Sequence, residues 1–222
     1  MTGQQQPPQA RTADLRKPYL LLIIAAFLVA AAVASPRIAH AEPDGALVFM
    51  EPFQDEVSDA TPWQQGEYEI APLAEYEVNA RVLSTAVYDD DREAQVAPID
   101  FALGWGGMAD RELLEQLSVH QDNRWYYVRW RNLALDPQDV IANSSNHHLL
   151  PANDEVLEQL KQVQPGDSVR LNGKLVRITA DDGWNWTSST SRFDTGDGAC
   201  EVMWVESVEI FPDEPIQYAQ ID

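Results

Sequence analysis

An uninterrupted apolar run from Tyr19 to Ala34 constrains this chain more than any other feature, because it decides on which side of a membrane the rest of the chain folds. The run is 16 residues long, whereas a helix needs ~20 apolar residues to span a bilayer and a signal-peptide core has ~7–15. It has no polar face, so it does not fit the amphipathic helix of a globular domain. Residues 19–35 are therefore predicted to be a membrane anchor or a signal sequence cleaved near Ala41, within the motif Ala39-His40-Ala41.

Basic residues flank this run almost entirely on its leading side. Arg11, Arg16 and Lys17 precede it, and Arg37 alone follows it closely. Because positive flanks stay in the cytoplasm, residues 1–18 are predicted to form a cytoplasmic tail, and the remainder is predicted to lie outside the cytoplasm of a bacterial cell. A retained anchor makes the protein a single-pass membrane protein, and cleavage makes it periplasmic or secreted.

The exported part is strongly acidic. The whole chain carries a net charge of −21 and residues 1–41 carry +3, so the remainder carries −24. Such a charge repels phosphate backbones and anionic lipids, which disfavours nucleic acid as a partner and favours neutral or cationic partners. The chain has a single cysteine, Cys200, so the domain is predicted to fold without an internal disulfide. No cofactor is predicted.

The pattern along the chain divides it into segments. Residues 36–66, which contain several prolines, are predicted to form an extended tether, residues 67–212 a globular domain and residues 213–222 a C-terminal tail. Alternation predicts strands, and capping residues predict helices. The predicted strands are Tyr76–Tyr88, Ile99–Gly104, Trp125–Trp130, a hairpin of Val169–Leu171 and Leu175–Ile178 that turns at Asn172-Gly173, and Glu201–Ile210. The predicted helices begin at the caps Asp110, Asp136 and Asn153; the first runs through Leu117, and Pro165-Gly166 ends the third.

This set of elements predicts a mainly β fold with a few short helices (α+β). We expect a small β-barrel or sandwich, either OB-like (oligonucleotide- or oligosaccharide-binding-like) or SH3-like, behind one N-terminal transmembrane or signal helix. A fold of this kind supports many functions, so the function depends on the site residues.

Four sequence blocks carry a resemblance. They stand in the order Asp100–Gly106 (DFALGWG), Asn146–Asn153 (NHHLLPAN), Asp182–Trp186 (DGWNW) and Arg192–Glu201 (RFDTGDGACE). In this combination, over roughly residues 67–208, the chain resembles a family of uncharacterised bacterial single-pass membrane proteins. The resemblance implies a retained anchor and an extracytoplasmic domain, and it implies no activity.

Cys200 and the adjacent residues His147 and His148 are the candidate catalytic residues. A thiol attacks as the thiolate, and a neighbouring histidine can take its proton while an Asn or Asp orients the imidazole ring. The residues available for that orienting role are Asn146, Asn153 and Asp197. The competing interpretation is structural, because a buried cysteine commonly behaves as a small hydrophobe.

The same region contains potential metal ligands, namely His147, His148, Asp194, Asp197, Cys200 and Glu201. No pair of them has the spacing of a zinc helix or knuckle, and adjacent histidines in an extended segment point to opposite sides, so no metal site is predicted. The segment 193–196 (FDTG) matches the aspartic-protease signature in one copy. That chemistry needs two carboxylates, which only a homodimer would supply.

Trp184 and Trp186 are the candidate ligand-binding residues, and His147 is a further candidate. If their segment is extended, the two indoles lie on one side of it and form a platform for sugar rings or a proline-rich peptide. The competing interpretation is that these rings belong to the core, which is predicted for most of the remaining aromatic residues.

Together these features favour a membrane-anchored, extracytoplasmic domain without enzymatic activity that binds an envelope component or a protein partner. The alternative is a cell-envelope hydrolase in which Cys200 is the nucleophile and His148 the base. A distance within about 4 Å between the Cys200 sulfur and a histidine nitrogen, in an open cleft, favours the enzyme. Full enclosure of Cys200 by apolar side chains argues against it.

Overall fold

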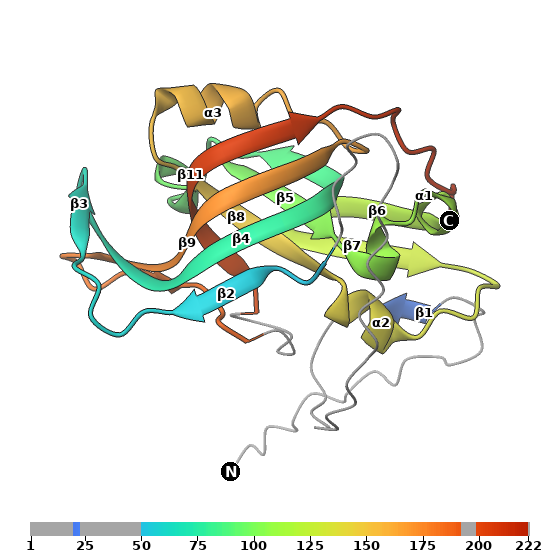
Figure 1. Ribbon diagram of the computed structural model, residues 1–222, viewed down its shortest axis with the longest axis horizontal. Helices are drawn as coiled ribbons and strands as arrows, with labels where there is room; N and C mark the ends of the chain where they lie inside the picture. Colours follow the sequence, from blue (N-terminus) through green and yellow to red (C-terminus); the bar gives the residue numbers. More distant parts are fainter. Residues whose placement is uncertain (1–19, 23–49, 192–198, 222) are drawn as a thin grey trace, which may run out of the picture.

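The computed structural model describes residues 20–22, 50–191 and 199–221 of the chain, and in these ranges it is mainly β with three short α-helices. Five strands close a barrel (Figure 1). In their order around the barrel they are β4 (Tyr68–Val87), β5 (Ile99–Gly104), β8 (Ser144–Pro151), β11 (Glu201–Phe211) and β9 (Ser168–Ala180), which pairs back onto β4. The predicted mainly β fold with a few short helices is confirmed.

The order of the strands makes this barrel OB-like rather than SH3-like. β8 and β11 are parallel, the other neighbours are antiparallel, and helix α3 (Asp154–Leu160) connects the third barrel strand to the fourth. OB barrels bind ligands on the face of their second and third strands and on the loops after their first and fourth strands. In this chain those are β5, β8, residues 88–98 (which contain the 3-10 helix η1, Glu93–Gln95) and the segment after β9.

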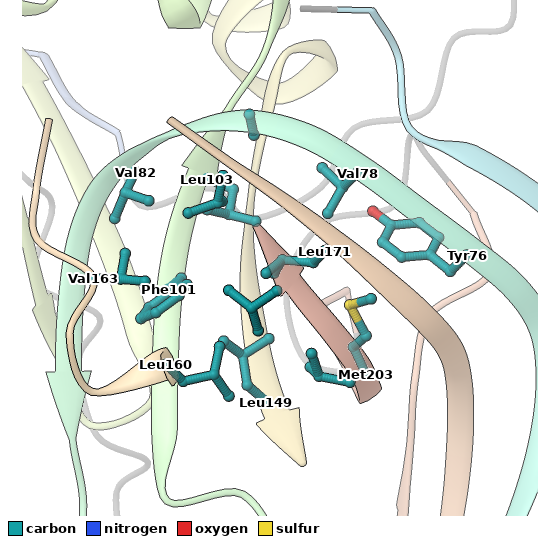
Figure 2. Packing of buried hydrophobic residues seen from close by; sticks show 14 of the residues in the cluster. Tyr76, Val78, Val82, Phe101, Leu103, Leu149, Leu160, Val163, Leu171 and Met203 are labelled. Atoms are coloured by element: carbon teal, nitrogen blue, oxygen red, sulfur yellow. The ribbon is translucent and has the colours of Figure 1, made fainter. Parts of the chain in front are cut away.

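The barrel interior is filled by the inward side chains of the alternating strands. Phe101, Leu103 and Leu149 meet Leu171 at its centre, and all four are fully buried (Figure 2). Leu160 of α3 closes one end together with Val163. The Asn153 side chain caps α3 by accepting the N–H of Val156 at 3.0 Å, as the sequence predicts.

A hairpin covers the outer face of β5 and β8. It consists of β6 (Leu117–Asp122) and β7 (Trp125–Trp130), and it buries a second apolar cluster against Leu83 and Ala102 of the barrel. The 3-10 helix η2 (Gly106–Ala109) and the helices α1 (Arg111–Leu114) and α2 (Pro137–Ala142) complete this cluster. The hairpin occupies the centre of the face on which OB barrels usually bind their ligands.

The far end of β4 and β9 forms a ribbon that covers another part of the outer face. Two short strands flank it, β3 (Trp63–Gln65) on β4 and β10 (Asn185–Thr187) on β9. Trp63, Ile70, Ile178 and Trp186 stand in one cross-strand row. A third apolar cluster joins this ribbon to Leu150 and Val202 of the barrel.

Three details differ from the sequence-based expectation. The predicted hairpin at Asn172-Gly173 is wrong, because β9 runs straight through it. Gly173 instead lets β11 approach closely, since a Cβ on it would lie 1.8 Å from the carbonyl oxygen of Trp204. The predicted tether includes β3 and β2 (Phe53–Glu56), both paired with β4, because their backbone groups find partners on that edge. The predicted C-terminal tail is docked, with the Tyr218 hydroxyl donating to the carbonyl of Leu83 at 2.6 Å.

The predicted anchor or signal, residues 19–35, lies outside the described residues except for strand β1 (Leu20–Leu22), whose backbone pairs with β7. The predicted cytoplasmic tail, residues 1–18, also lies outside them. Among the helices of the described part of the chain, none has the length and apolar character needed to cross a membrane.

Candidate functional site

The two adjacent histidines lie on opposite faces of β8, as expected for an extended strand. His147 faces the barrel interior, where its Nε2 is 3.0 Å from the Tyr76 hydroxyl and its Nδ1 is 3.4 Å from Ser145 Oγ. Ser145 in turn donates to the carboxylate of Glu201. His148 faces outward and is only 3% exposed, with Nδ1 2.9 Å from Asp100 Oδ2. The two atoms are in close contact, but Nδ1 is not aligned for a hydrogen bond.

A buried ionic network surrounds His148 and joins the barrel to the covering hairpin. Its centre is Arg124, whose Nη1 donates to Asp100 Oδ1 at 2.8 Å and to the carbonyl of Ala97 at 2.9 Å. The same guanidinium forms a bidentate pair with Asp91 at 2.7 and 2.6 Å and stacks on the ring of Tyr88, 3.8 Å from its centroid. Because Asp100 is completely buried, a carboxylate there requires the guanidinium of Arg124 as its partner.

The turn of the hairpin aims Arg124 at this network. Asn123 and Arg124 have φ values of 49° and 67° and connect Asp122 to its cross-strand partner Trp125. Positive φ at both central residues is the type I′ geometry, which matches the twist of a two-residue hairpin. The left-handed conformation is unfavourable for arginine, and the ion pairs of its side chain offset that cost.

The network also shifts the pKa values of its members. Hydrogen bonds from Arg124 hold the pKa of Asp91 below its ordinary value of 3.8. Burial alone would lower the pKa of Arg124, but Asp91 and Asp100 outweigh this effect and raise it. Burial, and then the charge of Asp100, raise the pKa of Tyr88. Asp91 is therefore held as a carboxylate and Tyr88 as a neutral phenol.

Aromatic rings continue from this network to the surface. The ring of Trp186 lies 4.7 Å from that of His148 and 6.3 Å from that of Trp184, and the ring of Trp184 lies 5.5 Å from that of Tyr68. Both tryptophans are half-buried, at the border of the third apolar cluster. Arg92 stacks on this surface, 4.8 Å from the centroid of Trp184.

An acidic groove of about 830 Å³ opens beside these rings. Its walls are formed by residues of the segment 88–98, among them Tyr88, together with Glu67 and Asp182. Asp91 pairs with Arg124 and Asp182 pairs with Arg92. Glu67, Asp89 and Asp90 have no cation within ion-pair distance among the described residues. The groove therefore presents three uncompensated carboxylates beside a loop that Arg124 holds in place through Asp91.

Cys200 is half-buried and directly precedes β11. Because Glu201 is in register with His147 in the parallel pair, Cys200 lies beside the preceding part of β8. Burial, and then Glu201 and Cys200, raise the pKa of Tyr126, whose hydroxyl lies 3.0 Å from that of Ser144. The proposed reaction between Cys200 and His148 stays a prediction.

The structure thus brings His148, Trp184 and Trp186 together and separates His147 from them. Among residues 50–191 and 199–221, no group of three His, Cys, Asp or Glu side chains is placed to hold a metal ion. Asp194, Asp197 and the segment 193–196, which was singled out for its protease-like signature, lie outside the described residues.

The ionic network of Asp91, Asp100 and Arg124 was not predicted from the sequence. Asp100 gave a usable signal, because a lone charge inside the apolar run Ile99-Asp100-Phe101 predicts a buried partner. The turn Asn123-Arg124 gave a weaker one, since Asn favours the left-handed conformation and follows an alternating segment. No local pattern predicts that Arg124 reaches Asp91, which lies 33 positions away.

Comparisons of the chain with protein-family models, with curated proteins and with solved structures found no match.

Proposed function

We propose that this protein is a non-enzymatic binding domain that takes a cationic segment of a protein partner into the acidic groove beside Trp184. The observation that carries the proposal is the position of three uncompensated carboxylates, Glu67, Asp89 and Asp90, next to half-exposed aromatic rings. A cationic side chain gains from both, through Coulomb attraction and through stacking on the rings.

The location of the groove supports this proposal. It lies between the loop after the first barrel strand and the segment after the fourth, the two segments that bind ligands in OB barrels. The covering hairpin closes the central face, so the ligand surface is confined to these segments. Because Arg124 fixes the wall formed by residues 88–98 through Asp91, little conformational freedom of that wall is lost on binding.

The test uses the intact chain, with its N-terminal segment, as bait in a pull-down from cell-envelope extracts at two salt concentrations. We expect Asp89→Asn with Asp90→Asn to lose a salt-sensitive protein partner without a change in Tm. The matched control is Glu112→Gln with Glu115→Gln, which removes the same charge from exposed positions on and next to α1. Equal capture by both double variants would overturn the proposal.

A second pair of substitutions, Trp184→Ala with Trp186→Ala, separates a protein partner from another envelope component. If this variant stays folded and loses binding to purified cell-wall polymer, while the Asp89/Asp90 variant keeps that binding, the ligand is a glycan rather than a protein. If the variant unfolds, the two rings belong to the core, and the proposal then depends on the groove carboxylates alone.

The proposed localisation is the bacterial cell membrane, with a single pass, the N-terminus in the cytoplasm and the barrel outside, as in the family that the chain resembles. The apolar run from Tyr19 and its one-sided basic flank support it. A C-terminal fusion to an export-dependent reporter should be active. Activity of a cytosol-dependent reporter in its place would sink this part of the proposal.

A cell-envelope hydrolase is the second candidate, and one contact favours it. Asp100 Oδ2 lies 2.9 Å from His148 Nδ1, so a carboxylate stands next to the imidazole that would act as the base. Cys200 would be the nucleophile. A reactive thiolate reacts with iodoacetamide at a pH well below its ordinary pKa of ~8.5, and His148→Gln should remove that reactivity. Slow alkylation of Cys200 that is unaffected by His148→Gln would exclude this function.

A further inference from the structure

Arg92 occupies a small box at the edge of the acidic groove. Its guanidinium forms a bidentate pair with Asp182, with Nη1 to Oδ2 at 2.8 Å and Nη2 to Oδ1 at 3.1 Å. Its Cζ lies 4.8 Å from the ring centroid of Trp184 and 5.8 Å from that of Tyr68. A planar cation thus has a carboxylate at its donor edge and two aromatic rings against it, which is the geometry that selects guanidinium.

Tyr68 and Asp182, two walls of this box, have hydrogen-bond partners other than Arg92. Tyr68 is 3% exposed, and its hydroxyl donates to Gln95 at 2.8 Å. The N–H of Trp184 donates to Asp182 Oδ1 at 3.0 Å, which orients that carboxylate. Arg92, by contrast, has a side chain that is 32% exposed and arrives from the opposite loop. Its contacts are the exposed type, which contributes little to stability.

We propose that the box of Tyr68, Trp184 and Asp182 is the binding site for an arginine side chain of the partner, and that Arg92 is a built-in competitor that the partner's arginine displaces. This inference rests on the function proposed above and names the chemistry that the groove recognises. Glu67, Asp89 and Asp90 line the same groove, so they attract a second cation to a box that is already neutralised by Arg92.

If Arg92 competes with the ligand, removing it strengthens ligand binding, whereas removing a residue that contacts the ligand weakens it. Removing Arg92 empties the box and leaves Asp182 without its partner, so an arginine ligand should bind more tightly to the variant than to the wild type. If Arg92 fills the box for about nine-tenths of the time, the gain is about tenfold, because apparent affinity scales with the fraction of competent sites.

The test is a fluorescence and NMR titration of the full chain with acetyl-Gly-Arg-Gly-amide, followed at the indole N–H of Trp184. Arg92→Ala is compared with Arg177→Ala, which removes the same charge from an exposed position on β9. We expect Arg92→Ala to bind about tenfold more tightly than the control. We expect Arg92→Ala with Asp182→Asn to lose that gain, and a lysine peptide to bind more weakly because it lacks the bidentate fork.

Equal affinity of the two single variants, or weaker binding by Arg92→Ala, would refute the competitor role. That failure is separable from a failure of the proposed function. If Asp89→Asn with Asp90→Asn still abolishes partner capture while the Arg92 result is negative, the groove binds its partner by another chemistry. If the peptide binds neither variant and capture is also unaffected, both proposals fall.

Discussion

Arg124 and Arg92 use the same chemistry in two different surroundings. Each forms a bidentate pair with an aspartate and stacks on an aromatic ring. The side chain of Arg124 is 13% exposed and it also pairs with Asp100, which is 0% exposed. Arg92 and its partner Asp182 are 32% and 60% exposed. Burial therefore makes the first contact a stable link between hairpin and barrel, whereas the second is a surface ion pair, as the proposed exchange of Arg92 requires.

The two arginines differ in stability because water can solvate the separated charges at one site and not at the other. When Arg92 leaves its box, water solvates both Asp182 and the guanidinium, so little free energy is lost. When Arg124 leaves, the carboxylate of Asp100 stays buried without its main cation, which is strongly unfavourable. The same pair of residue types thus stabilises the fold where it is buried and forms a weak surface contact where it is exposed, although Asp91 and Arg92 are adjacent in the chain.

The largest expected effect is that of Arg124→Ala. It should lower the free energy of unfolding by about 3–5 kcal/mol, because it leaves a buried charge uncompensated. Urea denaturation measures this directly. Arg124→Gly suits the φ of 67° and should lose nearly as much, which shows that the side chain and not the backbone is responsible. If Arg124→Ala lowers the free energy of unfolding as little as Arg92→Ala does, the proposed difference between the two arginines is wrong.

Arg124→Lys should have an intermediate effect. Lysine keeps the charge but lacks the planar fork that reaches Asp91 and Asp100 together and stacks on Tyr88. We expect a loss of about 1.5–3 kcal/mol, the range for hydrogen bonds to charged groups, again by urea denaturation. Full retention of stability would mean that the charge alone matters, and that the bidentate geometry does not.

Acid should distinguish the two arginines further. The pKa of Asp91 is held below 3.8 in the folded state by Arg124, so its contribution is fully present above that value and is lost as the pH falls below it. In Arg124→Ala this acid-dependent loss should be smaller than in the wild type. The pKa of Asp182 is lowered by Arg92, but this pair is exposed, so Arg92→Ala should leave the pH profile of Tm nearly unchanged.

The smallest effect is that of Arg92→Ala itself, for which we expect a loss of less than about 1 kcal/mol. A double-mutant cycle with Asp182→Asn should show a coupling that disappears in about 1 M salt, where the Debye length is about 3 Å. The coupling between Arg124 and Asp91 should persist in the same salt. If salt weakens both coupling energies equally, burial does not explain the difference between the two arginines.

Local sequence patterns predicted much of the fold. The strands Ile99–Gly104 and Trp125–Trp130 and the caps at Asp110, Asp136 and Asn153 agree with the structure, because alternation and side-chain capping act within a few residues. The predicted end of the first helix at Leu117 is wrong, because α1 ends at Leu114 and Leu117 begins β6. Asn172-Gly173 was misjudged because its glycine serves a close approach by β11, a contact 31 positions away between Gly173 and Trp204. No local pattern distinguishes that role from a turn.

The sequence by itself determined the mainly β architecture, the acidic character and the separation of His147 from His148, because each follows from periodicity or composition. Only the tertiary structure decided that Asp91, Asp100, Arg124 and His148 form one network and that Arg92 fills a box of Trp184 and Asp182. These groups come from loops and strands far apart in the chain. Their proximity depends on how the barrel closes, and charge pairs have no periodicity from which that could be deduced.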